Sequence, residues 1–203
     1  MLFGRTGGLV GLGRIARGVA ERLAGFGVRI LAYDPFVKVD ATPAGIELSD
    51  LDSLLRSSDI VSLHVSITPS ARSLIDERAL ALMKPTAYLV NTSRGEAVDE
   101  AALYRALKEK RIAGAALDNF VVEPLPGESP LRKLDTVILT PHMVGHTKDV
   151  FASFPAAAVQ NITRILRGDL PLHCKNPEVA PAWKARLARL SAWPSANCAT
   201  PFL

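Results

Sequence analysis

Residues 9–34 read LVGLGRIARGVAERLAGFGVRILAYD, and the rest of the chain is organised around this stretch. A short apolar run leads into a glycine turn, Gly11-Leu12-Gly13, and apolar residues then recur at helical spacing from Ile15 to Phe26. A second apolar run follows and ends on Asp34. Strand, glycine turn, helix, strand and terminal acid together predict the first βαβ unit of a dinucleotide-binding sheet.

Each part of this unit has a physical reason. Gly11 can adopt a backbone conformation that a side chain would strain, and Gly13 has no Cβ to keep a pyrophosphate away from the backbone. Free N–H groups at the start of the following helix bind such an anion. Asp34 follows Gly13 at the distance expected for an acid that binds the adenosine ribose, so NAD is favoured over NADP. The alternative is a glycine turn that serves only helix–strand packing.

The composition sets the class of protein. The chain has 203 residues, 48% of them hydrophobic and 22% charged, which suits a globular fold with a sizeable core. The net charge of +4 lies in residues 161–203, where basic residues are not interleaved with aromatics, so we expect no nucleic-acid binding. We also expect no membrane span. The N-terminus lacks a signal-peptide core and Cys174 and Cys198 suggest no disulfide framework, which together favour the cytoplasm.

Beyond residue 34, helical and strand patterns alternate. We expect strands at 60–65, 87–90, 114–118 and 136–140, helices at 50–56, 76–83 and 99–110, and a long helix at 147–167 that Pro155 interrupts or begins. Ser49, Asp76 and Asp99 are the predicted N-caps, and residues 35–48 are expected to form a loop or short crossover. This order predicts an α/β fold with a doubly wound parallel sheet, of Rossmann type. We place the NAD-binding domain at 1–168 and a partly disordered tail at 169–203, with a short basic amphipathic stretch at 183–190.

In a parallel sheet of this kind, ligands bind beyond the carboxyl ends of the strands. The polar residues that follow the expected strands therefore gather at one edge: Asp34, Ser66, Thr92, Ser93, Arg94, Asp118 and His142. His64 falls inside an expected apolar strand, so we expect it in the core.

Four further stretches, taken with the GLGRIA turn and its following YDP, sharpen the interpretation: LHVSITPSAR, NTSRGEAVDEAAL, GAALDNFVVEPLP and TPHMVGHT. Together they resemble the NAD-binding domain of the D-isomer-specific 2-hydroxyacid dehydrogenases, which include glyoxylate/hydroxypyruvate reductases, D-lactate dehydrogenases and phosphoglycerate dehydrogenases. The likeness extends from about residue 2 to residue 168. It implies NAD as cofactor, a small 2-oxo or 2-hydroxy acid as substrate, no metal, and a homodimer.

The resemblance also implies a catalytic trio. Arg94 would bind the carboxylate or keto oxygen of a 2-oxo acid through its fork of donors. His142 would protonate the substrate carbonyl as hydride arrives, and Glu123 would pair with the imidazole and favour its protonated form. Formate dehydrogenase is a related alternative with different chemistry, and the presence of Glu123 argues against it.

The cofactor-binding set implied by the resemblance comprises Gly11, Gly13, Arg14, Ile15, Asp34, Ser66, Thr92, Ser93, Arg94, Asp118, His142 and Gly145. In this set Arg14 and Ile15 lie over the pyrophosphate. Asp118 binds the carboxamide of the nicotinamide or its ribose, or else only caps the end of its strand. The sequence departs from the family at Ser66, usually proline, and at Ala71, often threonine, and both positions border the adenosine pocket.

Family members carry a separate substrate-binding lobe, built mostly from residues before the glycine turn. We expect that lobe to be absent from this chain, so that the chain binds NAD but turns over poorly. Two other interpretations stay open: a non-catalytic NAD sensor or corepressor-like module, and a gene fragment. The retained trio of Arg94, Glu123 and His142 indicates descent from an enzyme in either case.

Overall fold

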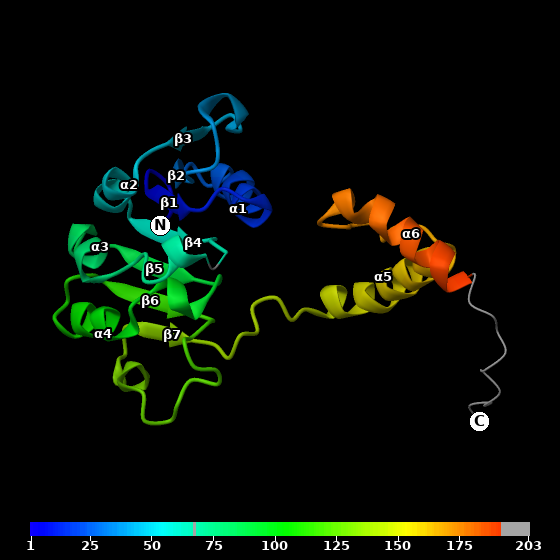
Figure 1. Cartoon of the computed structure of the whole chain (residues 1–203). Coiled ribbons are helices and arrows are strands. Elements are labelled where there is room, and N and C mark those ends of the chain that lie inside the picture. Colours follow the sequence, from blue (N-terminus) through cyan, green and yellow to red (C-terminus); the bar gives the residue numbers. More distant parts are fainter. Residues whose placement is uncertain (67, 192–203) are drawn as a thin grey trace. The chain divides into compact units, whose positions relative to one another are not determined.

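The computed structural model describes residues 1–66 and 68–191, and it divides into two compact units (Figure 1). The first unit is Met1–Val144 and the second is Gly145–Leu203. The division therefore precedes the long helix that the sequence analysis included in the NAD-binding domain. Each unit is described by itself.

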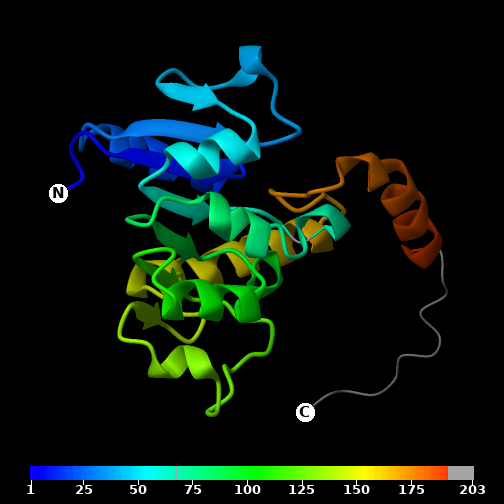
Figure 2. The same cartoon turned by 90° about the vertical axis from the view of Figure 1, so that its left-hand side faces the viewer.

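The first unit is built on one parallel sheet (Figure 2). The strands are β1 (Thr6–Val10), β2 (Arg29–Tyr33), β3 (Ile46–Leu48), β4 (Ile60–Leu63), β5 (Tyr88–Asn91), β6 (Gly114–Leu117) and β7 (Val137–Leu139), in the order β3-β2-β1-β4-β5-β6-β7. Every pairing is parallel, for instance Leu9 with Ala32 and with Ser62. From β1 the chain adds β2 and β3 on one side, and then β4 to β7 on the other, so the strand order reverses between β1 and β4, which is the switch point of a doubly wound sheet. This confirms the predicted fold class.

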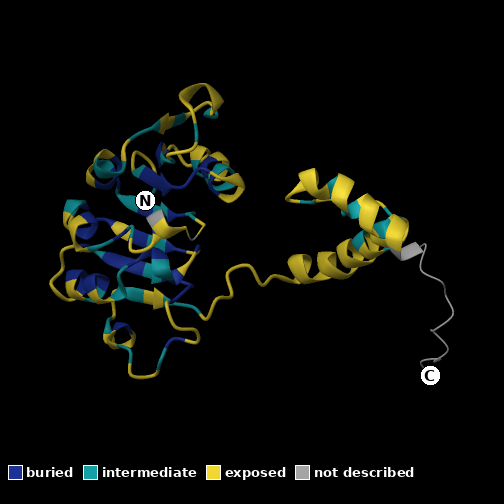
Figure 3. Cartoon of the chain, in the orientation of Figure 1, coloured by how far each residue is buried: buried dark blue, intermediate teal, exposed yellow. Residues whose placement is uncertain are grey.

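Helices cover the sheet on both faces (Figure 1). They are α1 (Arg14–Ala24), α2 (Leu51–Ser57), α3 (Glu77–Leu82) and α4 (Glu100–Lys108), with 3₁₀ turns at Val39–Ala41, Pro69–Ala71, Gly95–Ala97 and Pro130–Lys133. Two apolar clusters result. The smaller joins Ala16 and Ala20 of α1 to Ile30 and Ala32 of β2, and the larger packs α2, α3 and α4 on the other face. The strands at the centre of the sheet are the most buried part of the unit (Figure 3).

Aspartates begin three of these helices. The side chains of Asp50, Asp76 and Asp99 accept hydrogen bonds from the backbone N–H three residues on, at 2.8, 2.8 and 2.9 Å. Two of these N-caps confirm the prediction. The expected cap at Ser49 is wrong, because its neighbour Asp50 caps α2 instead and offers a charged acceptor to the positive end of the helix.

The crossover at residues 35–48 holds more structure than the expected loop. It contains the 3₁₀ turn Val39–Ala41 and the edge strand β3, which pairs with β2. Arg29 of β2 and Glu47 of β3 form a two-point ion pair, with its shorter contact at 2.6 Å. This pair lowers the pKa of Glu47. A three-residue strand has too short a pattern to be recognised from sequence, so the missed β3 has a simple cause.

The second unit consists of α5 (Lys148–Leu166), the 3₁₀ turn Pro177–Val179 and α6 (Ala180–Ser191). Thr147 caps α5 through its hydroxyl, and the helix runs through Pro155 without a break, so the expected interruption is wrong. The basic stretch at 183–190 lies within α6, which is longer than expected. The expected disorder at the extreme C-terminus concerns residues outside the described range. Over the part of the chain that the structure describes, no helix is long and apolar enough to cross a membrane.

Candidate active site

The predicted site residues of the first unit follow the carboxyl ends of neighbouring strands. Gly11, Asp34 and His64 come directly after β1, β2 and β4, and Asp118 follows β6. Arg94 and His142 lie three residues beyond the ends of β5 and β7. Because β1, β2 and β4 are adjacent, and β5, β6 and β7 likewise, these loops gather at one edge of the sheet. The edge therefore divides into two neighbouring halves.

The glycine turn has the geometry that an anion site requires. Gly11 has φ +94°, and a Cβ there would lie 2.7 Å from the carbonyl oxygen of His64. A Cβ on Gly13, in contrast, would meet no described atom within 4 Å. Gly13 is the N-cap of α1, its cap has no side-chain hydrogen bond, and the first turn of that helix has no acid. The N–H groups at this end of α1 are thus available to a phosphate.

A cavity of about 480 Å³ opens beside this turn. Its walls are formed by Gly11, Gly13, Tyr33, Asp34, Pro35, Phe36, His64, Val65, Ser66, Thr68, Ala71 and Leu74. The carboxylate of Asp34 accepts the N–H of Leu12 at 2.8 Å and that of Phe36 at 2.9 Å. The predicted ribose acid is therefore fixed against the glycine turn and borders the cavity.

A second cavity, of about 280 Å³, is lined by Ile15, His64, Val65, Ser66, Thr92, Ser93 and Arg94. His64 and Ser66 line both cavities. The expectation that His64 belongs to the core is wrong: β4 ends at Leu63, so His64 is half-buried at the sheet edge, with its Nε2 3.0 Å from the Ser62 hydroxyl. Burial lowers the pKa of His64, which favours the neutral ring. Its place one residue beyond the strand was the signal that the sequence analysis missed.

Asn91, at the end of β5, orders the turn that carries Arg94. It is 1% exposed, its side-chain NH₂ donates to the Arg94 carbonyl at 2.8 Å, and its Oδ1 accepts from the backbone and hydroxyl of Ser93. Nη1 of Arg94 donates to the Ser93 carbonyl at 2.6 Å. The sequence analysis did not single out Asn91, although a buried amide directly before the Arg94 turn is the residue that fixes it.

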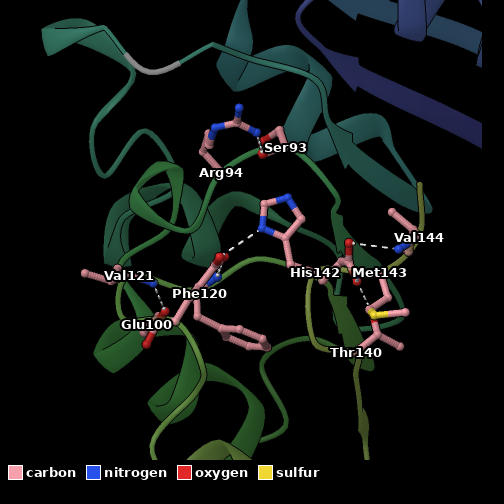
Figure 4. Close-up of polar contacts among 11 residues, drawn as sticks. Ser93, Arg94, Glu100, Phe120, Val121, Thr140, His142, Met143 and Val144 are labelled. Carbon is pink, nitrogen blue, oxygen red and sulfur yellow. Dashed lines mark hydrogen bonds and ion pairs between the residues drawn. The ribbon is translucent and has the colours of Figure 1, made fainter. Parts of the chain in front are cut away.

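Glu123 and His142 form a pair, with Oε2 of the carboxylate 2.9 Å from Nδ1 of the imidazole (Figure 4). Oε1 accepts the Phe120 N–H at 3.1 Å. The hydrogen bond with His142, followed by that from Phe120, lowers the pKa of Glu123. A carboxylate held ionised at Nδ1 orients the ring and leaves Nε2 as the position for proton transfer. The two residues predicted to work together are therefore brought together.

Asp118 fixes the turn that carries His142. It is 2% exposed, and its carboxylate accepts from the Thr140 hydroxyl at 2.5 Å and from the N–H groups of Met143 and Val144 at 2.8 and 3.2 Å (Figure 4). Burial alone raises the pKa of Asp118, but these hydrogen bonds outweigh it and the net pKa is lowered. His142 itself has φ +56°, an unusual conformation for a residue other than glycine. Of the two roles considered for Asp118, the structure shows the capping of the strand end.

The remaining predicted cofactor residues do not all line the same cavity. Thr92 and Ile15 line the second cavity, whereas Arg14 lines a separate cavity between α1 and residues 43–46. Gly145 begins the second unit, so its cofactor role stays a prediction. Across residues 1–66 and 68–191, no group of three potential ligands is arranged to hold a metal ion.

Comparison with known proteins places this geometry in context. The family model described as "D-isomer specific 2-hydroxyacid dehydrogenase, NAD binding domain" matches residues 1–144. A glyoxylate reductase of Thermofilum pendens is 48% identical over 180 residues, which are 88% of this chain and 53% of that protein. The chain thus spans about half the length of this relative.

Solved structures of similar proteins superpose on this chain. A D-lactate dehydrogenase with NAD⁺ from Lactobacillus jensenii superposes with a TM-score of 0.77 at 31% identity, over 84% of this chain and 55% of that one. A D-isomer specific 2-hydroxyacid dehydrogenase from Xanthobacter autotrophicus, in complex with NADPH, gives 0.73 at 34% identity, over 87% and 72%. Because the family model covers the whole of the first unit, the chain belongs to the D-isomer specific 2-hydroxyacid dehydrogenases, through their NAD-binding domain.

Proposed function

We propose that the first unit binds NAD and that Arg94, Glu123 and His142 serve a reversible hydride transfer between NAD(H) and a small 2-hydroxy or 2-oxo acid. The observation that carries the proposal is the Glu123–His142 pair at 2.9 Å, on the loops that follow β6 and β7. The turn with Arg94 follows the neighbouring strand β5. This chemistry needs a guanidinium group, an imidazole paired with a carboxylate and an anion-binding turn, and all three follow strands at one edge of the sheet.

Each residue has a separate task. When bound, NADH supplies the hydride that adds to the carbonyl carbon of the 2-oxo acid. His142 delivers a proton from Nε2 to the carbonyl oxygen, and Glu123 holds the ring by its other nitrogen. Arg94 uses one nitrogen on the Ser93 carbonyl, which leaves its other donors for the substrate carboxylate. In the oxidation of the hydroxy acid, the same proton returns to His142.

The residues present fit a dinucleotide. The position of a Cβ on Gly13 is open, the start of α1 has free N–H groups, and the two cavities share His64 and Ser66. Asp34 borders the larger cavity with a carboxylate, which would repel the 2′-phosphate of NADP. This supports NAD as the preferred cofactor, although relatives have been solved with NAD⁺ or with NADPH.

The test pairs binding with turnover on the 203-residue chain. Calorimetry with NAD⁺ and NADH measures binding. Loss of NADH absorbance with glyoxylate, hydroxypyruvate, pyruvate or 3-phosphohydroxypyruvate measures turnover and ranks the substrates. His142→Ala is expected to remove turnover while NAD affinity changes little, and His173→Ala, in the second unit, is the matched control.

The outcomes separate the hypotheses. Equal loss of binding and turnover in His142→Ala would make His142 structural. Binding of NAD with no turnover on any of the acids would contradict the hydride transfer by this chain and leave its NAD binding in place, and no binding of either cofactor contradicts the proposal altogether. The homodimer and the cytoplasmic location stay predictions.

A further inference from the structure

The segment that carries Glu123 is anchored from outside itself. Between the end of β6 and Glu123 the chain has no regular structure, and Val121 and Val122 are more than half exposed. The position of Glu123 therefore depends on contacts with other elements.

One such contact comes from the start of α4. Oε1 of Glu100 accepts the backbone N–H of Val121 at 2.8 Å, as Figure 4 shows. Glu100 is the first residue of α4, and the N-cap of that helix is already supplied by Asp99. The carboxylate of Glu100 is thus not needed as a helix cap and can bind the segment.

A second contact, from Gly95, holds the backbone at Phe120 and Val121. Gly95, in the 3₁₀ turn after Arg94, lies so close that a Cβ on it would be 2.0 Å from the carbonyl carbon of Phe120 and 2.4 Å from the nitrogen of Val121. Phe120 in turn donates its N–H to Oε1 of Glu123. Backbone packing by Gly95 and the hydrogen bond to Glu100 hold the segment at adjacent points.

We propose that Glu100 is a positioning residue for the Glu123–His142 pair. It fixes Val121, and through Val121 and Phe120 it holds the Glu123 carboxylate against Nδ1 of His142. The inference deepens the proposed function, since it rests on that function for the catalytic role of the pair. Asp118, whose charge also interacts with His142, accepts hydrogen bonds from Thr140, Met143 and Val144.

The chain offers a closely matched control. Glu77 is the first residue of α3 and follows the N-cap Asp76, as Glu100 follows Asp99. Its carboxylate pairs with Arg105 at 3.0 Å and Arg111 at 3.6 Å, and the structure gives it no hydrogen bond to residues 119–123. Glu77→Ala thus removes a glutamate from the same helical position without touching the segment.

The experiment uses the cofactor-free 203-residue chain. Glu100→Ala is expected to speed amide exchange at Val121 by about tenfold or more, because the hydrogen bond to a charged acceptor is lost. The pKa of Glu123, followed by carbon-detected NMR of its carboxyl group, should rise towards its ordinary value as its pairing with His142 weakens. Glu100→Gln keeps an oxygen that can accept from Val121 and should leave both readouts close to wild type.

The control decides the outcome. If Glu100→Ala leaves the Val121 exchange and the Glu123 pKa equal to those of Glu77→Ala, the inference is wrong. Should Glu100→Ala fail to fold, Glu100→Leu keeps the side-chain bulk without an acceptor and answers the same question. None of these readouts needs cofactor or substrate, so a lack of turnover would count against the proposed function and not against the role of Glu100.

Discussion

Gly95→Ala tests how closely the turn of Arg94 and the segment of Glu123 are packed. The added Cβ would lie 2.0 Å from the carbonyl carbon of Phe120, 2.3 Å from its oxygen and 2.4 Å from the nitrogen of Val121. All three are backbone atoms, so no side chain can rotate away. Normal van der Waals contact begins near 3.4 Å, and the two backbones must therefore separate by about 1.4 Å.

The size of this shift sets two expected effects. Overpacking of this kind costs about 3 kcal/mol or more, which lowers the melting temperature of a unit of this size by roughly 6–12 °C. A displacement of about 1.4 Å is also larger than the margin between the 2.9 Å from Glu123 to His142 and the roughly 3.2 Å beyond which hydrogen bonds weaken. Weaker pairing should raise the pKa of Glu123 towards its ordinary value.

Gly127→Ala is the control, because Gly127 lies in the same loop and a Cβ there would meet no described atom within 4 Å. Thermal denaturation followed by circular dichroism measures both variants. Gly127→Ala should melt within about 2 °C of the wild type. If Gly95→Ala melts at the same temperature as Gly127→Ala, the close approach does not exist in solution and the reasoning fails.

Three further predictions concern charges at the sheet edge. Asp118→Asn should lower the free energy of unfolding near pH 7 by roughly 2–3 kcal/mol, measured with denaturant, because three donors lose a carboxylate. Since the pKa of Asp118 is lowered in the folded protein, the wild type has this advantage above about pH 4 and loses it as the pH falls. Equal differences at pH 7 and pH 3 would contradict the prediction. Asp34→Ser should bring the NADP and NAD dissociation constants closer by calorimetry, and an unchanged ratio would remove Asp34 from cofactor choice. Burial lowers the pKa of His64, so the stability that the neutral ring provides above about pH 6.5 should decline as the pH falls through the pKa of His64 in the folded protein. The melting temperature of His64→Gln should lack that decline, and the same pH dependence in the variant and the wild type would disprove the prediction.

Local signals made much of the fold predictable. The glycine turn, the following helix and the aspartate caps depend on neighbours in sequence, and Gly11, Asp76 and Asp99 have the conformations expected of them. The alternation of strands and helices then fixed the parallel sheet. The edge strand β3 was missed because three residues carry no clear periodicity.

The residues of the candidate site could be named from the sequence, but most of the hydrogen bonds that hold them could not. His64 was assigned to a strand that ends one residue earlier, which moved a cavity residue into the expected core. Asp118 was predicted either to bind the cofactor or to cap the end of its strand; the partners that make it a cap lie 22 to 26 residues further along the chain and are known only from the fold. The bond from Val121 to Glu100, also long-range, is of the same kind.

The strand order bears on whether nucleotide binding and catalysis in this domain can be lost separately. The residues suited to the nucleotide follow β1, β2 and β4, whereas Arg94, Glu123 and His142 follow β5, β6 and β7. The boundary between recognition and reactivity lies between the adjacent strands β4 and β5, and the second cavity, which His64 and Ser66 line together with Arg94, extends across it. A descendant that lost Glu123 and His142 by substitution would keep the glycine turn, Asp34 and the first cavity, and with them the part of the site that suits a nucleotide.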